Sequence, residues 1–101
     1  MGTRLELQDL LEDLLESSEV YYQAPASKDM EYPAIVYSRE GMEPIHADNK
    51  KYTLFNRYTL TVIDRMPDNP VINKILELPK SRYDRPYKAD NLYHDVITLY
   101  Y

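Results

Sequence analysis

The sequence contains no cysteine and no tryptophan, and it has only two glycines among 101 residues. Without cysteine, the chain can form no disulfide framework, no thiolate zinc site and no cysteine nucleophile. Two glycines are too few to build a Gly-rich loop that cradles phosphates. The absence of disulfides fits assembly in a reducing cytosol, and the scarcity of glycine argues against nucleotide chemistry.

Long hydrophobic runs are also absent. No apolar stretch approaches the roughly 18 to 20 residues that a membrane span requires. Met1 leads into acidic residues instead of a basic and then apolar leader, so we expect a soluble chain without an export signal. With 101 residues and a mass of 12.0 kDa, the chain is expected to form a single domain over residues 1–101 with one core.

The aromatic residues are almost all tyrosine, with eleven tyrosines and one phenylalanine. Tyrosine suits surfaces that are half buried or become buried on association. The net charge of −5 is uneven, because residues 1–31 carry eight acidic and two basic residues while the rest carries nine and ten. An acidic total argues against tight binding of nucleic acid. We therefore expect protein partners more than substrates.

The first predicted element is an amphipathic helix. Thr3 and Glu6 have the spacing of a capping box. Five leucines then share one helical face over about four turns; they are Leu7, Leu10, Leu11, Leu14 and Leu15. Acidic residues occupy the other face. The simpler interpretation is that the leucines dock on a sheet and the acids are solvated, and the alternative is that the acidic face binds a partner.

Two strands are expected next. Val20–Tyr22 suits a short strand, and Ala24–Lys28 reads as a connection because it contains proline and serine. Pro33 then precedes a second strand over Ala34–Arg39, where proline is tolerated at the first position. Gly41 and Pro44 are expected to end that strand.

The segment Gly41–Lys51 has little periodicity, so it is predicted to be a loop of about ten residues, longer than the usual hairpin loop. From Tyr52 a long strand is predicted by period-two alternation. One face of this strand carries Leu54, Tyr58, Leu60 and Val62, and the other carries Thr53, Arg57, Thr59 and Thr61. The strand is expected to be half buried.

Asp68 is predicted to cap a second helix that has Pro70 in its first turn and ends at Pro79. Its apolar side consists of Val71, Ile72, Ile75, Leu76 and Leu78. Two further strands are predicted over Arg82–Tyr87 and Leu92–Tyr100. The order α-β-β-β-α-β-β predicts an α+β domain in which two helices pack on a mixed or antiparallel β-sheet.

No constellation in the sequence carries enzyme chemistry. His46 lies near Asp48, and His94 precedes Asp95, but metal and acid–base sites need three or more converging groups at defined spacing. No serine lies in a GxSxG elbow. We therefore expect a protein that is not an enzyme and holds no cofactor and no metal.

Basic and aromatic residues alternate in the second half of the chain, where arginines are interleaved with Tyr58, Tyr83 and Tyr87. Arginine and tyrosine are enriched at the centres of protein interfaces. Protein contacts are the favoured interpretation, with plain surface charge and nucleic-acid binding as alternatives. The candidate interaction residues are His46, Lys50, Lys51, Arg57, Arg65, Arg82, Arg85 and Tyr87.

Three stretches resemble the tail terminators, a family of small tail-completion proteins that join head and tail in long-tailed bacteriophages and prophages. They are YPAIVYSRE (Tyr32–Glu40), NRYTLTVIDRMPDNP (Asn56–Pro70) and YDRPYKADNLYHDVITLYY (Tyr83–Tyr101). The shared features are the Tyr-Pro opening of a strand, the Arg-Tyr strand that leads into Asp-Arg-x-Pro, and the Asn-Leu-x-His-Asp segment. None of these features is an enzymatic signature.

The resemblance implies a non-enzymatic virion protein at the tail–head neck, assembled in the cytoplasm of the bacterial host. Its subunits would form a ring, expected to be a hexamer, that caps the tail tube protein and meets a head-completion or neck protein. DNA would pass through the lumen without sequence-specific binding. We expect the Gly41–Lys51 loop to reach a neighbouring subunit or the tube. The alternatives are another head–tail connector, such as a head-closure or adaptor protein, and a small monomeric or dimeric regulatory binding module.

Overall fold

The computed structural model describes residues 3–23, 30–47 and 51–101, and for residues 43–47 and 51–54 only the backbone. Its elements follow in the order α1 (Arg4–Leu15), β1 (Val20–Tyr22), β2 (Ala34–Ala47), β3 (Lys51–Asp64), α2 (Pro70–Leu76), β4 (Ser81–Ala89) and β5 (Leu92–Tyr100). The predicted α+β class and element order are thereby confirmed. The predicted connection Ala24–Lys28 lies outside the described residues.

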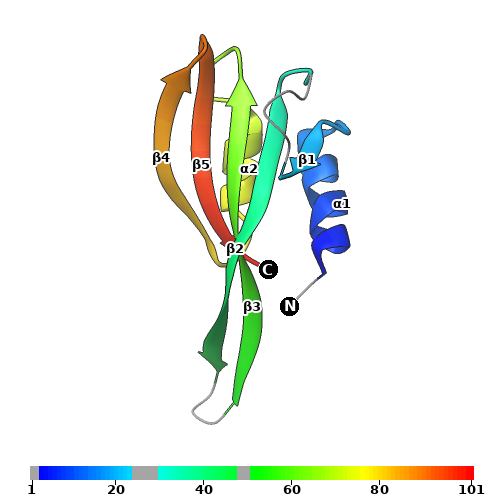
Figure 1. The fold of residues 1–101 in the computed structure, drawn as a ribbon, viewed down its shortest axis with the longest axis vertical. Helices are drawn as coiled ribbons and strands as arrows, with labels where there is room; N and C mark the ends of the chain where they lie inside the picture. Colours follow the sequence, from blue (N-terminus) through cyan, green and yellow to red (C-terminus); the bar gives the residue numbers. More distant parts are fainter. Residues whose placement is uncertain (1–2, 24–29, 48–50) are drawn as a thin grey trace.

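The five strands form one mixed sheet in the order β1-β2-β3-β5-β4. The short strand β1 runs parallel to β2, whereas β2–β3, β3–β5 and β5–β4 are antiparallel pairs. Figure 1 shows α2 behind the sheet and α1 beside β1 and β2. Side chains of both helices join the same buried cluster, so the two helices cover the same face of the sheet.

The capping box predicted for α1 is present. The Thr3 hydroxyl accepts a hydrogen bond from the Glu6 N–H, and the Glu6 carboxylate accepts one from the Thr3 N–H. The hydrogen bond from the Thr3 N–H, followed by the interaction of the Thr3 hydroxyl with the carboxylate, lowers the pKa of Glu6. The helix has 12 residues, a little over three turns, and ends where Glu16 adopts the left-handed conformation with φ 59°. Leu7 and Leu11 are fully buried, as the leucine stripe predicts.

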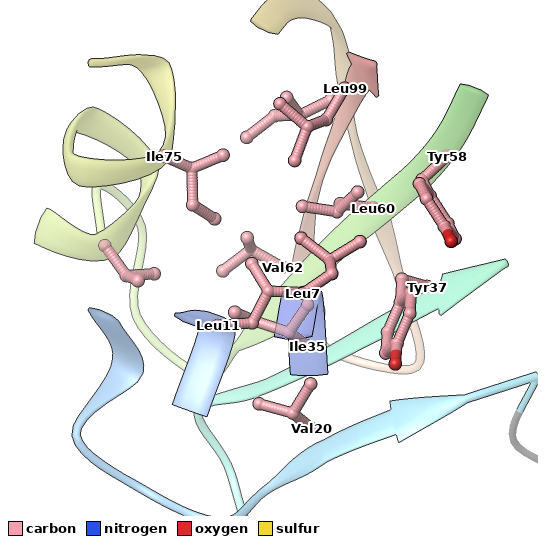
Figure 2. Packing of buried hydrophobic residues seen from close by; sticks show 12 residues of the cluster. Leu7, Leu11, Val20, Ile35, Tyr37, Tyr58, Leu60, Val62, Ile75 and Leu99 are labelled. Atoms are coloured by element: carbon pink, nitrogen blue, oxygen red, sulfur yellow. The ribbon is translucent and has the colours of Figure 1, made fainter. Parts of the chain in front are cut away.

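The core lies between the helices and the sheet, and β3 supplies its centre. Tyr58, Leu60 and Val62 are buried at alternate positions, which confirms the predicted period. Figure 2 shows them packed among the side chains of Leu7, Leu11, Val20, Ile35, Tyr37, Ile75 and Leu99. The Tyr37 ring lies 5.1 Å from the Tyr22 ring and 5.9 Å from the Tyr58 ring. Its hydroxyl donates a 2.6 Å hydrogen bond to Gln8.

The prediction that Gly41 and Pro44 end the strand, and that Gly41–Lys51 is a loop, is wrong. Strand β2 continues to Ala47 and pairs with β3, from Gly41↔Arg57 to Ala47↔Lys51. A bulge between Arg39 and Gly41 absorbs the irregularity. A Cβ at Gly41 would lie 3.2 Å from Nη2 of Arg57, so a side chain at this position would require the Arg57 guanidinium to move slightly. Pro44 is tolerated because every second N–H of a two-stranded ribbon points away from the partner strand.

The predicted N-cap of α2 is wrong by one residue. Asn69, and not Asp68, is the N-cap, since its side chain accepts a 2.8 Å hydrogen bond from the Val71 N–H. Asp68 instead adopts a left-handed conformation with φ 61°, which turns the chain into the helix. Pro70 occupies the first turn as predicted. The helix ends at Leu76, before Pro79, and strand β4 is longer than predicted at both ends.

The most unusual feature is the extension of β2 and β3 beyond the sheet. Strand β5 pairs with β3 only from Arg57 to Asp64, and β1 pairs with β2 only at Ile35–Tyr37. We call the unsupported part, Glu43–Ala47 paired with Lys51–Phe55, the ribbon. It projects from the rest of the molecule (Figure 1). The protein accordingly measures 48 × 22 × 22 Å, with a radius of gyration of 14.1 Å against about 13 Å for a compact chain of this length.

Candidate protein-interaction surfaces

The ribbon holds part of the candidate set. His46 pairs with Tyr52 and Lys51 pairs with Ala47 along the backbone, so these two candidates lie at the outer end of the ribbon. Lys50 lies outside the described residues. An isolated two-stranded hairpin is marginally stable in water, and here neither the helices nor the other strands extend alongside it. A ribbon of this kind becomes more stable when another surface packs against it.

At the base of the ribbon, Asn56 of β3 pairs with Tyr101, the residue that follows β5. Asn56 exchanges two backbone hydrogen bonds with Tyr101, of 3.2 and 3.0 Å. The Asn56 side chain is only 8 % exposed, and its amide oxygen has no hydrogen-bond partner in the described part of the chain. The sequence contains a signal for this site, because Asn56 occupies an apolar position of the β3 alternation. Asn56 is not among the candidate residues predicted from the sequence.

Four candidates share the face of the sheet that is opposite to the helices, which we call the open face. The register places Arg57 and Thr59 beside Tyr100 and Thr98, and it places Arg82, Arg85 and Tyr87 beside Thr98, Val96 and His94. Alternation along each strand puts these side chains on one side. No helix covers this face within residues 3–23, 30–47 and 51–101. The structure therefore places Arg57, Arg82, Arg85 and Tyr87 on one face, with Arg57 beside Tyr100 and Tyr87 beside His94 at different points along β5.

The rim of the open face along β4 is organised by a bulge between Tyr83 and Arg85. The bulge places Asp84 on the open face, where its carboxylate accepts a 2.6 Å hydrogen bond from the Thr98 hydroxyl and lies 3.4 Å from Nη2 of Arg82. All residues of β4 from Arg82 to Ala89 are exposed. Strand β4 is thus an exposed edge that presents ordered arginine and tyrosine side chains.

Tyr87 stacks on His94 with the ring centroids 4.5 Å apart and the planes 13° apart, and the Arg85 guanidinium lies 5.9 Å from the Tyr87 ring. Stacked aromatic rings with an adjacent arginine are typical of interface centres. The adjacent residues His94 and Asp95 do not come together, because neighbouring residues of a strand face opposite ways. His94 lies on the open face, and Asp95 lies on the helix face beside Tyr83.

Arg65 is separated from the other candidates. It follows β3, and its guanidinium lies 5.8 Å from the Tyr32 ring. Together with Tyr32 it lines a hollow of about 400 Å³ near the turn between β4 and β5. The candidate residues thus divide between the ribbon, the open face and this hollow.

Among the described residues, no group of three or more histidine, aspartate or glutamate side chains could hold a metal ion. No described helix is both long and apolar enough to cross a membrane. In comparisons with known proteins, no family model matches the chain and no curated protein is significantly similar to it.

Proposed function

We propose that this chain is a non-enzymatic structural protein of a phage virion, a ring-forming subunit that caps the tail tube and joins the tail to the neck of the head. The proposal combines the resemblance to tail terminators with one observation, the projecting ribbon. It includes a homo-oligomeric ring, expected to be a hexamer, with the tail tube protein on one side and a head-completion protein on the other.

The ribbon supports the proposal because most of its backbone projects from the body. The body contacts the base of the ribbon, where the Lys80 ammonium lies 4.9 Å from the Phe55 ring centroid. The five backbone pairs from Glu43↔Phe55 to Ala47↔Lys51 extend past the end of β5. Contact with a neighbouring subunit or with the tube would supply the packing that the chain itself does not provide. We therefore still propose that this segment reaches a neighbouring subunit or the tube. It would do so as a two-stranded ribbon instead of the predicted loop.

The charge distribution supports head-to-tail association of subunits. Helix α1 lies near one edge of the sheet and β4 forms the other edge (Figure 1). The exposed side of α1 carries Glu6, Asp9 and Asp13, whereas the β4 edge presents Arg82 and Arg85. Rings form when two different patches of the subunit meet head to tail. Opposite charges on opposite edges favour that geometry over a two-fold dimer.

The deciding experiment is negative-stain electron microscopy of purified tail tubes mixed with the protein. We expect rings at one end of the tube, with a diameter close to that of the tube. Bare tube ends at saturating protein would contradict the terminator proposal. In that case, pull-down with head proteins would test the alternative of a head-closure or adaptor protein.

A ribbon-shortened variant isolates the contribution of the ribbon. Residues 43–55 are replaced by an Asn-Gly turn, which suits a two-residue hairpin between the paired residues Met42 and Asn56. The body should keep its far-UV circular dichroism, because the core lies outside the ribbon. We expect this variant to lose end-capping. The matched control, Lys74→Ala, removes an exposed ion pair with Glu16 on the helix side and should cap tubes like the unmodified chain.

A small regulatory binding module is the alternative from a different class. It would remain monomeric or dimeric and would wait for one specific partner. Sedimentation of the protein with and without tubes separates the two proposals, because a terminator assembles on the template even when the free subunit is monomeric. Failure to bind tubes, together with capture of one host protein, would favour the module.

A further inference from the structure

A groove lies between α2, the connection that precedes it, and the β4–β5 hairpin. It consists of two adjoining hollows of about 420 and 270 Å³. Asp68, Tyr83 and Asp95 line both hollows. The smaller hollow is completed by α2 and its cap, through Asn69, Ile72, Asn73 and Leu76. None of the candidate interaction residues except Tyr87 lines this groove.

The shared part of the groove is anionic. The Tyr83 hydroxyl donates a 2.6 Å hydrogen bond to Oδ1 of Asp95, which leaves Oδ2 of Asp95 without a recorded partner in the described part of the chain. Asp68 makes no hydrogen bond or ion pair among the residues described. The lining of the smaller hollow contains both carboxylates and no basic residue. Two carboxylate groups therefore face this space without a cation of the chain beside them.

The protonation of Tyr83 fits this arrangement. Its hydrogen bond to Asp95, followed by burial and by the charges of Asp95 and Asp68, raises the pKa of Tyr83 to about 12. The hydroxyl thus remains a donor at neutral pH and holds the Asp95 carboxylate in place. The Tyr83 side chain is nevertheless 38 % exposed, so its ring is accessible from the groove.

Aromatic rings form the walls of the groove. Tyr83 and Tyr93 both line the larger hollow. The Lys88 ammonium lies 5.0 Å from the Tyr93 ring centroid, which shows that this wall already accommodates a cation over a ring face. Lys88 lines the larger hollow together with both carboxylate residues, and it does not line the smaller one. The groove combines flat aromatic surface with an excess of negative charge.

We propose that this groove binds the guanidinium group of an arginine side chain presented by a partner protein. A guanidinium is planar and weakly hydrated, so it stacks on a tyrosine ring, and its fork of N–H donors matches a carboxylate. Stacking against Tyr83 and donation to Oδ2 of Asp95 and to Asp68 would satisfy each of these groups. A lysine ammonium is a strongly hydrated point charge and fits the flat wall less well. The assignment does not depend on ring formation or on tail binding.

The test uses the isolated chain and small probes. N-acetyl-arginine amide is titrated into isotope-labelled protein and followed by NMR, alongside N-acetyl-citrulline amide, which has a similar shape without the charge, and N-acetyl-lysine amide. We expect saturable, millimolar binding of the arginine probe that shifts the ring signals of Tyr83 and Tyr93 and the amide signal of Asp68. Equal shifts from citrulline would overturn the proposal, and so would equal affinity for lysine or no shift with arginine.

Variants assign the binding to the groove. Asp95→Asn and Asp68→Asn each remove one charge while the side chain keeps its shape, and each should weaken arginine binding about threefold to tenfold, as expected for a partly exposed charge pair. The control Asp13→Asn removes an exposed carboxylate on α1, far from the groove in sequence and outside its lining, and should leave the affinity unchanged. An equal loss in all three variants would show that net charge alone attracts the probe, and the proposal would fail even if the protein caps tail tubes.

Discussion

Replacement of Asn56 by leucine should stabilise the fold. The side chain is 8 % exposed, and its amide oxygen lacks a hydrogen-bond partner among the described residues. A buried polar group without a partner costs about 1–3 kcal/mol. Leucine has a similar size and no polar atom, so the free energy of unfolding should rise by about 1–2 kcal/mol. For a domain of this length, each kcal/mol raises the melting temperature by about 4–8 °C.

Urea unfolding followed by far-UV circular dichroism measures this effect. The midpoint should increase by about 0.3–2 M with an unchanged slope, given slopes of about 1–3 kcal/mol per molar urea for small proteins. Asn69→Leu is the matched control, because the Asn69 amide accepts from the Val71 N–H and donates to Asp64. Loss of this cap should destabilise the protein by about 1 kcal/mol. If Asn56→Leu also lowers the midpoint, the Asn56 oxygen has a partner in solution and the reasoning is refuted.

Three further outcomes follow from the core and from the groove. Tyr37→Phe removes the hydrogen bond to Gln8 and should cost about 0.5–1.5 kcal/mol in the same urea assay; an unchanged midpoint would contradict it. Leu11→Ala should cost about 2–5 kcal/mol, because the side chain is fully buried, and thermal unfolding by circular dichroism would show a large drop in melting temperature unless the cavity collapses. The pKa of Tyr83 is raised to about 12 by its hydrogen bond to Asp95, so the stability this bond contributes is complete below about pH 10 and is lost as the pH rises towards 12. Ultraviolet titration of Tyr83→Phe should therefore show one fewer tyrosine ionising near pH 12, and loss of a tyrosine that ionises near pH 10 would refute the assignment.

The parts of the fold that the sequence predicts correctly are those in which burial imposes a period. The leucines of α1 repeat with the helix because one side meets the core, and Tyr58, Leu60 and Val62 alternate because one face of β3 is buried. The ribbon is different. No described helix and no third strand accompanies its backbone, so no core imposes a pattern on Glu43–Ala47 and Lys51–Phe55. From the local sequence alone, Gly41 and Pro44 therefore predict the end of a strand. In the structure, pairing with β3 keeps this segment extended.

The candidate surfaces show a similar division. Composition alone identifies arginine and tyrosine as interface residues, but only the strand register shows that Arg57 lies on the same face as Arg82 and Arg85. No pattern in the sequence predicts the groove. Its shared residues Asp68, Tyr83 and Asp95 come from separate segments, and none of them has a sequence neighbour that indicates the other two. Proximity of this kind follows from the chain reversals around α2 and the β4–β5 turn.

Strand β3 belongs to both the ribbon and the core. It runs without interruption from Lys51 to Asp64 and is the central strand of the five. A load applied at the ribbon would therefore pass along a stiff, continuous backbone to Leu60 and Val62, without a flexible joint at the sheet boundary. Binding of a partner at the outer end of the ribbon would therefore change the twist of β3, the middle strand of the sheet. The change would reach the part of β3 that lies in the hydrophobic core. A hairpin attached to an edge strand would leave the rest of the sheet far less affected.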